Sequence, residues 1–299
     1  MTPAARVQAA IDLLDAVIAA ARGGGASADR VAGEWLRARR FIGSKDRRAI
    51  RDLVWAAIRA CGDVPETGRA AMLRLAQGDA ALAGLFDGSG YGPAAIAPGE
   101  AVASGGIAPA WVVAALEESG IVGDEQAALL DRAPLDIRAN TLKISREALR
   151  ARLPVESAPL PAGNGLRLAT GAAAESWPEY ADGLFEVQDG GSQLTCEAFG
   201  AQPGETVVDL CAGAGGKTLA LGAAMENAGR LVACDIDRAR LSRLPERAGR
   251  AGVRAETRLL DSGRERAALA DLAGQCDGVL VDAPCSGTGT WRRNPEARW

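Results

Sequence analysis

From Thr206 onward, short apolar runs alternate with helical patterns along the chain. The runs are "TVVDL" (206–210), "RLVACD" (230–235), "AETRLL" (255–260) and "DGVLVD" (277–282). Helical patterns separate them, one from about Lys217, then "RARLSRLPERAG" (238–249) and "ERAALADLA" (265–273). Strands that alternate with helices in this way predict a parallel, doubly wound α/β sheet.

A second pattern precedes this sheet. "LDIRANTL" (135–142), "GLRLAT" (165–170) and "LFEVQD" (184–189) have the composition of strands, and "SREALRARL" (145–153) that of a short capped helix. We therefore expect a small α+β module over residues 133–199, followed by the sheet domain over residues 200–299.

The first 132 residues form a third, helical segment. Apolar positions such as Val31, Trp35, Ile50 and Val54 recur at helical spacing, and "GSKD" offers Ser44 as an N-cap. Turn-forming stretches interrupt the pattern at 86–93 and 97–109. The sequence therefore predicts three domains, over residues 1–132, 133–199 and 200–299.

Composition narrows the chemistry that this chain can perform. It contains no histidine, and its six cysteines include no Cys-x-x-Cys pair, so we expect no metal site. Without histidine, catalysis must use Asp, Glu, Cys, Lys or a cofactor. Asp12 and Asp15 interrupt the first apolar stretch, which is typical of neither a signal peptide nor a membrane span. We expect a cytoplasmic monomer with reduced thiols that contacts no membrane.

Positive charge gathers in one window, although the net charge of the chain is −4. Residues 30–59 hold nine basic and three acidic side chains, a local balance of +6. The candidate RNA-binding residues in this window are Arg37, Arg39, Arg40, Arg47 and Arg48. The alternative is that these arginines are a solvated helix surface without a partner.

A glycine-rich turn follows the first strand of the sheet, in "LCAGAGGKT" (210–218). Such turns let backbone N–H groups approach a ligand at the carboxyl edge of the sheet. A Walker loop would require glycine at 211 and a dinucleotide fingerprint glycine at 218, where this chain has Cys211 and Thr218. Both phosphate-binding motifs are therefore excluded by spacing.

Acidic residues end all four strands of this sheet, at positions 209, 235, 261 and 282. Asp235 follows Asp209 by 26 residues, the spacing at which an acid meets ribose hydroxyls. Each acid alone could instead cap a helix. Together they predict a nucleoside ligand without phosphates, for which S-adenosylmethionine is the obvious candidate. The predicted cofactor-binding residues are Cys211, Ala212, Gly213, Ala214, Gly215, Gly216, Lys217, Asp235, Asp261 and Asp282.

The last strand leads into "VDAPCSGTGTWRRNPEARW" (281–299). Cys285 in this loop is either a small packing residue or a nucleophile, because a lone cysteine serves in both ways. Lys217 is likewise either a surface residue at a helix start or a ligand of the cofactor.

The motifs "VVDLCAGAGGKT", "ACDID", "LLDSG" and "DAPCSGTGTWRRNPEARW" closely resemble the RsmB/NOP/Sun family of S-adenosylmethionine-dependent RNA (cytosine-5) methyltransferases. "FIGSKDRRAIRDLVWAAIR" is similar to part of a NusB-like domain, and "LDIRANTLKISREALRARL" to the family's small RNA-binding module. The resemblance implies a Rossmann-like class I methyltransferase sheet, preceded by a NusB-like all-α domain and a small α+β RNA-binding module.

The resemblance also implies catalytic roles. A thiolate adds to carbon 6 of cytosine, which makes carbon 5 nucleophilic, and an acid near ring nitrogen 3 stabilises the adduct. Asp282 corresponds to that acid and Cys285 to a cysteine that assists release of the methylated RNA. The attacking cysteine of the family lies in a Thr-Cys-Ser motif after a fifth strand. We expect that motif beyond Trp299, and therefore a C-terminally incomplete sheet and an inactive 299-residue chain.

The expected substrate is ribosomal RNA, in particular a cytosine of the 16S molecule. Two alternatives stay open at this point. One is a transfer RNA cytosine-5 methyltransferase, and the other is an inactive RNA-binding or assembly factor, which the missing second cysteine motif would favour.

Overall fold

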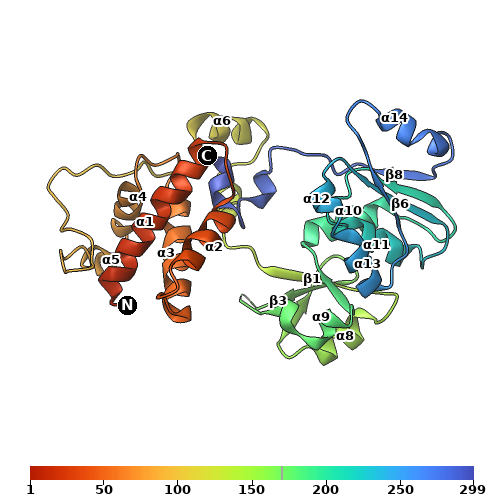
Figure 1. Ribbon diagram of the computed structural model, residues 1–299, viewed down its shortest axis with the longest axis horizontal. Coiled ribbons are helices and arrows are strands. Elements are labelled where there is room, and N and C mark those ends of the chain that lie inside the picture. Colours follow the sequence, from red (N-terminus) through yellow and green to blue (C-terminus); the bar gives the residue numbers. More distant parts are fainter. Residues whose placement is uncertain (170) are drawn as a thin grey trace. The chain divides into compact units, whose positions relative to one another are not determined.

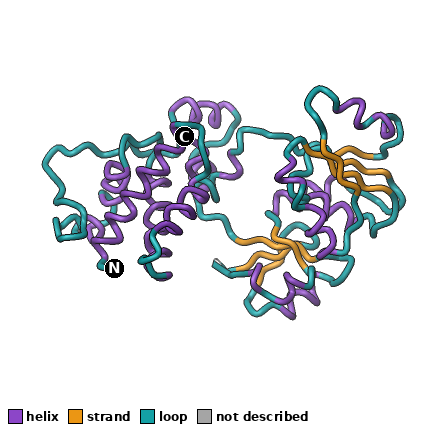
Figure 2. The backbone as a smooth tube through the Cα atoms, in the orientation of Figure 1, coloured by secondary structure: helices purple, strands orange, loops and turns teal. Residues whose placement is uncertain are grey.

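The computed structural model describes residues 1–169 and 171–299. The chain divides into two compact units (Figure 1). The helical unit comprises Met1–Ala133 and Ser286–Trp299, and the sheet unit comprises Pro134–Cys285. Within the described residues, every named strand lies in the sheet unit (Figure 2).

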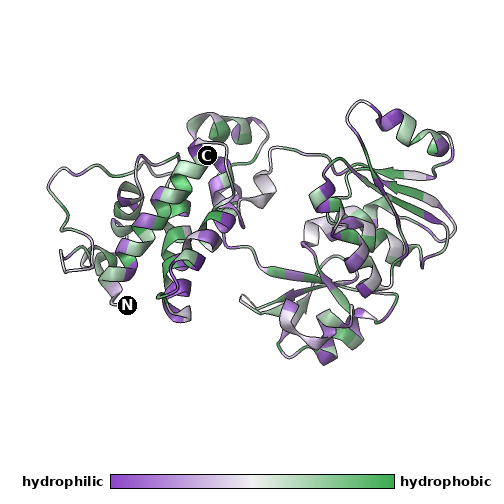
Figure 3. Ribbon diagram, in the orientation of Figure 1, coloured by the Kyte–Doolittle hydropathy of each residue, from purple (hydrophilic) through white to green (hydrophobic). Residues whose placement is uncertain are grey.

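The helical unit is built around its longest helix, α1. Its elements are α1 (Pro3–Arg22), α2 (Ala28–Ala38), α3 (Ser44–Ala60), α4 (Gly68–Ala76), α5 (Ala80–Ala83), α6 (Ala110–Glu118), α7 (Asp124–Ala128), and the 3₁₀ helices η3 (Thr288–Thr290) and η4 (Pro295–Arg298). Helix α1 packs against α2, α3 and α4. The shared core includes Leu13, Leu14, Ile50, Ile58 and Met72. Figure 3 shows hydrophilic stretches on α2 and at the start of α3.

Helix α3 begins one residue earlier than its predicted cap implies. Gly43 has the extended N-cap conformation, and Ser44 is the first helical residue. The predicted N-cap role of Ser44 is therefore wrong. The predicted helical periodicity is confirmed, since Ile50 and Val54 are fully buried.

The last residues of the chain cap two helices of the helical unit. The first amide of α2, at Ala28, donates to Glu296 Oε1 at 2.9 Å. At the end of α3, Arg298 Nη2 donates to the carbonyls of Ile58 at 2.8 Å and Cys61 at 2.7 Å. An acid at a helix start and a cation at a helix end both match the helix dipole. These contacts fix the segment after Ser286 to the helical unit.

The first sheet of the sheet unit has four antiparallel strands in the order β2-β3-β1-β4. They are β1 (Leu135–Ala139), β2 (Ser157–Pro159), β3 (Gly165–Leu168) and β4 (Phe185–Val187). Ile137, Leu166 and Phe185 form the core that this sheet shares with helix α8 (Arg146–Arg152). The expected strand 165–170 is confirmed over its first four residues. Its last residue, Thr170, lies outside the described residues.

The second sheet is parallel, with strand order β7-β6-β5-β8. Its strands are β5 (Thr206–Asp209), β6 (Arg230–Asp235), β7 (Glu256–Leu259) and β8 (Gly278–Leu280). The remaining helices of the sheet unit are η1 (Ala174–Ser176), α9 (Pro178–Ala181), α10 (Gly190–Phe199), α11 (Gly216–Ala224), α12 (Arg238–Leu241), α13 (Leu244–Ala251), α14 (Glu265–Ala268) and η2 (Ala270–Leu272). The predicted alternation of strand and helix is confirmed. The expected helix 238–249 is divided into α12 and α13, with Pro245 in the first turn of α13.

Both faces of the two central strands, β5 and β6, are covered, whereas Val279 of the outer strand β8 is 49% exposed. Val207 and Leu231 belong to one buried cluster, and their neighbours Val208 and Val232 belong to another. Successive side chains of a strand point to opposite faces, so continuous apolar runs are what a doubly covered sheet requires.

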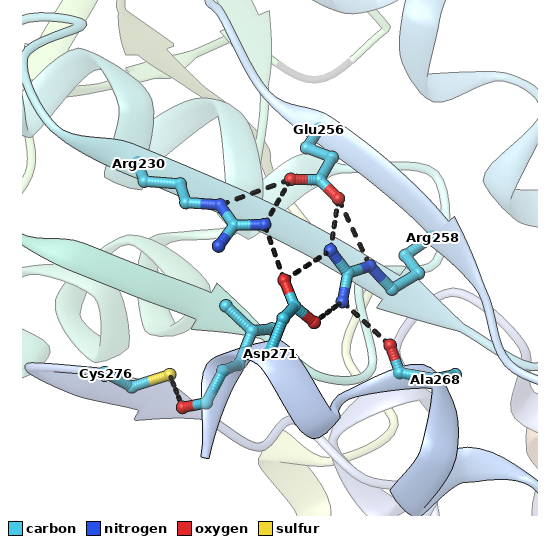
Figure 4. Close-up of polar contacts among 7 residues, drawn as sticks. Arg230, Glu256, Arg258, Ala268, Asp271 and Cys276 are labelled. Carbon is cyan, nitrogen blue, oxygen red and sulfur yellow. Dashed lines mark hydrogen bonds and ion pairs between the residues drawn. The ribbon is translucent and has the colours of Figure 1, made fainter. Parts of the chain in front are cut away.

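The outer strand β7 is held by an ion-pair network (Figure 4). Arg230 and Arg258 each pair with both Glu256 and Asp271. The hydrogen bonds from Arg258 and Arg230 lower the pKa of Asp271 to about 2. Charged side chains on an edge strand disfavour pairing with another chain. The network therefore protects this edge of the sheet.

The three-domain division stays a prediction. The structure gathers residues 134–285 into one unit, which contains both sheets, and residues 286–299 into the other. Among the described residues, no helix combines the length and the apolar character needed to cross a bilayer.

Candidate cofactor and catalytic site

The glycine-rich turn lies between β5 and α11, at the carboxyl edge of the parallel sheet. Gly213 and Gly215 adopt positive φ angles of 56° and 88°. Gly215 is the N-cap of α11, and an added Cβ there would stand 2.1 Å from Leu244 Cδ1. The turn therefore needs glycine at 215 both for its backbone conformation and for its packing.

Asp235, the last residue of β6, ties this turn to the neighbouring strand. The N–H of Gly213 donates to Asp235 Oδ2 at 2.6 Å, and the N–H of Asp237 donates to Oδ1 at 2.7 Å. The residue is only 7% exposed. Each carboxylate oxygen keeps acceptor capacity for a further donor. The side chain thus fixes the loop and still offers oxygens to a ribose hydroxyl.

Asp209, at the end of β5, carries an unsatisfied oxygen beneath the loop. Its Oδ2 accepts a hydrogen bond from Thr218 Oγ1 at 2.7 Å. Its Oδ1 is buried without a partner among the described residues. Burial raises the pKa of this carboxyl. A ligand that donates a hydrogen bond at this edge of the sheet would satisfy Oδ1.

Lys217 and Asp282 form an ion pair across the sheet edge. Lys217 Nζ in α11 lies 2.6 Å from Asp282 Oδ2, which follows β8. The Lys217 side chain is 15% exposed and the Asp282 side chain 52%. Lys217 is therefore not a solvated surface residue. It holds the acid that lies two residues before Pro284 and Cys285, in the loop called the Pro-Cys loop here.

Cys285 is the exposed cysteine of the described chain, whereas the other five thiols are buried or partly buried. Burial raises the pKa of Cys61 and of Cys234 to about 11. It also raises the pKa of Cys196 and Cys211. Thiols held protonated in this way are poor nucleophiles. Cys285 is therefore the thiol best placed to meet a substrate.

Strand order explains why these residues share one edge. The amide of Leu210 donates to the carbonyl of Leu280 at 2.9 Å, and the amide of Leu260 to the carbonyl of Asp235 at 2.9 Å. These bonds place the ends of β5, β8, β6 and β7 side by side. Asp261 follows at the same edge, exposed, and its carbonyl accepts from Arg264 at 2.9 Å.

Comparison with known proteins identifies this arrangement. Residues 197–299 match the family model described as 16S rRNA methyltransferase RsmB/F. Ribosomal RNA small subunit methyltransferase B of Yersinia pseudotuberculosis serotype O:1b is 34% identical over 199 residues, which cover 64% of this chain and 45% of that protein. The chain is thus similar to members of the RsmB/NOP/Sun family of methyltransferases. It spans a little under half the length of the curated relatives it matches.

Other comparisons agree with this family. Ribosomal RNA small subunit methyltransferase B of Serratia proteamaculans is 32% identical over 197 residues, 64% of this chain and 45% of that protein. The crystal structure titled PH0851 has a TM-score of 0.68 at 22% identity and covers all of this chain and 78% of its own. NSun6 from Pyrococcus horikoshii has a TM-score of 0.50 at 20% identity over 57% of this chain and 70% of its own. The predicted fold class is confirmed: a helical N-terminal region, a small α+β module and a Rossmann-like sheet.

Gln188, which directly follows β4, and Arg247 of α13 support the glycine-rich loop, and sequence reasoning missed both. Gln188 Nε2 donates to the carbonyl of Gly216 at 3.2 Å, and Arg247 Nη1 to the carbonyl of Ala214 at 2.7 Å. Arg247 also pairs with the buried Glu186 at 2.7 Å. These contacts join residues far apart in the sequence. The only sequence signal was that polar residues end the run "LFEVQD".

The predicted RNA-binding arginines lie around the junction of α2 and α3. Arg37, Arg40 and Arg48 are exposed. Arg39 stacks over the ring of Trp35 at 3.6 Å, and Arg47 Nε donates to the carbonyl of Ile42 at 2.8 Å. Two of the five thus interact with residues four or five positions earlier in the chain. The described residues contain no cluster of three or more His, Cys, Asp or Glu side chains that could hold a metal ion.

Proposed function

We propose that this chain acts in the S-adenosylmethionine-dependent methylation of carbon 5 of a cytosine in small-subunit ribosomal RNA. One observation carries the proposal: a glycine-rich loop closed by Asp235 lies beside an acid held by Lys217 and an exposed Cys285. The named relatives are ribosomal RNA small subunit methyltransferases. The NSun6 structure, which shares the fold, was solved with SFG.

The proposed cofactor fits the residues of this edge. The carboxylate of Asp235 would accept the ribose hydroxyls, and the loop from Cys211 to Lys217 would approach the cofactor through its backbone. The buried Oδ1 of Asp209 would gain a donor. When bound, S-adenosylmethionine supplies an electrophilic methyl group.

The residues of the Pro-Cys loop would act on the cytosine ring. The attacking thiolate would be that of the second cysteine, in the Thr-Cys-Ser motif. Its addition to carbon 6 moves an electron pair toward carbon 5, which then takes the methyl group. Loss of the carbon 5 proton and elimination of the thiol restore the aromatic ring. Asp282, oriented by Lys217, would stabilise the adduct at ring nitrogen 3, and Cys285 would assist the elimination.

Replacing Asp235 tests the proposed cofactor site. The variant Asp235→Ala should weaken S-adenosylmethionine binding at least tenfold, about 1.4 kcal/mol, because it removes the acceptor for the ribose hydroxyls. Isothermal titration calorimetry on the 299-residue chain measures this change. Asp237→Ala is the matched control, because Asp237 lies two residues further on and caps α12. Equal affinities for wild type and Asp235→Ala would refute the cofactor assignment.

The arginine surface makes a separate prediction about RNA. Replacing exposed Arg37 and Arg48 together by alanine should lower the salt slope of RNA binding by roughly one to two units, because each phosphate contact releases counterions. Fluorescence anisotropy at several salt concentrations measures the slope. Arg30→Ala serves as control, since Arg30 is exposed but paired with Glu34 at 3.0 Å. An unchanged slope in the double variant would make these arginines a solvated helix surface.

A further inference from the structure

One cavity in the helical unit is lined by arginines other than those predicted from sequence to bind RNA. It has a volume of about 620 Å³, and Trp55, Arg59, Arg132 and Arg292 are among its lining residues. A second cavity of about 430 Å³ shares Arg51, Asp52 and Arg132 with it and extends to Arg47 and Arg48. Together the two form one groove, called the arginine groove here.

The arginine groove carries a net positive charge. Seven arginines and three aspartates line it, a balance of +4. Of these aspartates, Asp29 pairs with Arg51 at 2.5 Å. Arg51, Trp55 and Arg59 recur every four residues and therefore lie along one face of α3. The charge thus follows a helix in a line, as a nucleic-acid backbone would require.

Backbone carbonyls, which are neutral, hold the innermost arginines. Arg59 donates to the carbonyls of Leu130 at 3.0 Å, Trp55 at 3.3 Å and Arg292 at 3.1 Å. Arg292 donates to the carbonyls of Asp131 at 3.3 Å and Arg132 at 3.4 Å. Within the described part of the chain, neither guanidinium has an ion pair with a carboxylate. Both are therefore fixed in place without a direct carboxylate partner.

Burial and the neighbouring positive charge both act on Arg59. Burial lowers the pKa of its guanidinium, and the nearby charge of Arg132 lowers it further. An anion in the cavity would offset the repulsion between the two guanidinium groups. Arg132 is exposed at the shared wall of the two cavities, where it can reach such an anion.

We propose that the arginine groove binds the phosphate backbone of single-stranded RNA, with Arg59, Arg132 and Arg292 around one phosphate. The proposal rests on the RNA-directed function proposed above and extends the arginine surface from Arg47 and Arg48 into the groove. Planar guanidinium forks held in advance match phosphate oxygens better than flexible lysines would. Arg292 follows Cys285 closely in the sequence, so the groove would hold RNA on the chain segment that continues from the Pro-Cys loop.

The test measures binding of a fluorescein-labelled twelve-nucleotide oligouridylate to the 299-residue chain by anisotropy over a salt series. Arg132→Ala should weaken binding roughly fivefold and lower the salt slope by about one unit, since one phosphate contact is lost. Arg132→Lys should keep the slope, because it keeps the charge. Arg30→Ala, outside the groove, should match wild type in both quantities.

Any of four results would overturn the proposal. One is a wild-type slope in Arg132→Ala, and another is an equal loss in Arg30→Ala. A third is displacement of the oligouridylate by polyglutamate of equal charge as readily as by unlabelled RNA, which would indicate an acidic-peptide surface. Since replacing Arg59 could unfold the end of α3, Arg292→Lys, which keeps its charge, provides the second variant and should weaken affinity without changing the slope. An unchanged affinity in Arg292→Lys would count against the phosphate fork.

The proposed function is checked separately in the same samples. S-adenosylmethionine binding to Arg132→Ala should equal that of wild type, because Arg132 lies outside the cofactor site. If wild type binds the cofactor and RNA but the groove variants behave as wild type, only the groove is refuted. If wild type binds no RNA, the RNA-directed function fails as well.

Discussion

Replacing Gly215 by alanine should destabilise the sheet unit by about 2–5 kcal/mol. A β-carbon at a φ of 88° costs roughly 1–2 kcal/mol, and forcing it against packed side chains costs about 1–3 kcal/mol more. The new methyl group would meet Leu244, which is fully buried, so it cannot simply turn away. Hydrogen exchange of peptides from β5 and β6 measures the loss as a lower free energy of opening.

Gly216→Ala is the matched control for this prediction. Gly216 is the first residue of α11, its φ is not positive, and an added Cβ would meet nothing within 4 Å. Alanine is the better helix former by about 1 kcal/mol. The opening free energy of Gly216→Ala should therefore equal or exceed that of wild type. Equal opening free energies for the Gly215 and Gly216 variants would show that the loop does not depend on its left-handed turn.

The second large effect concerns Cys285. In a protein that continues past Trp299 through the family's Thr-Cys-Ser motif, Cys285→Ala should accumulate a covalent RNA adduct that survives denaturing electrophoresis. The other thiol would still add to carbon 6, whereas the elimination that Cys285 is proposed to assist would be impaired. Wild type should show no such band.

The matched control replaces the cysteine of the Thr-Cys-Ser motif as well as Cys285, which should remove the band. Loss of methylation in Cys285→Ala with no adduct would identify Cys285 as the nucleophile. Methyl transfer by the 299-residue chain alone would contradict the scheme in which one cysteine attacks carbon 6 and Cys285 assists release.

Sequence reasoning predicted the parallel sheet because that architecture produces recognisable local sequence patterns. Apolar runs such as "RLVACD" are strands buried on both faces, and an acid at the end of each strand lies at the carboxyl edge by topology alone. The proximity of Asp235 to the loop and of Asp282 to Lys217 follows from that order. Strand β2 left no such trace, because it has three residues and ends in Pro159.

Contacts between distant segments could not be predicted in this way. Buried Glu186 forms ion pairs with Arg247 and Arg250, and Gln188 donates a hydrogen bond to the carbonyl of Gly216. No hydrophobic periodicity in the sequence predicts either interaction. Glu296 lies 268 residues from the helix that it caps. The arginine groove is similar. It combines one face of α3 with residues 130–133, at the end of the unit's first segment, and with Arg292 and Arg293 of its second segment. Only the folded chain brings such residues together.

The central proposal is that this protein takes part in the methylation of carbon 5 of cytosine in ribosomal RNA. Small-subunit ribosomal RNA would be incubated with S-adenosylmethionine and the protein continued through the Thr-Cys-Ser motif, then digested to nucleosides and analysed by chromatography with mass spectrometry. The account predicts 5-methylcytidine, which is absent when Asp235 is replaced by alanine. Its isomer N4-methylcytidine has the same mass but a different retention time. Methylation at that nitrogen, or no methylated cytidine from a protein that binds both cofactor and RNA, would contradict the account.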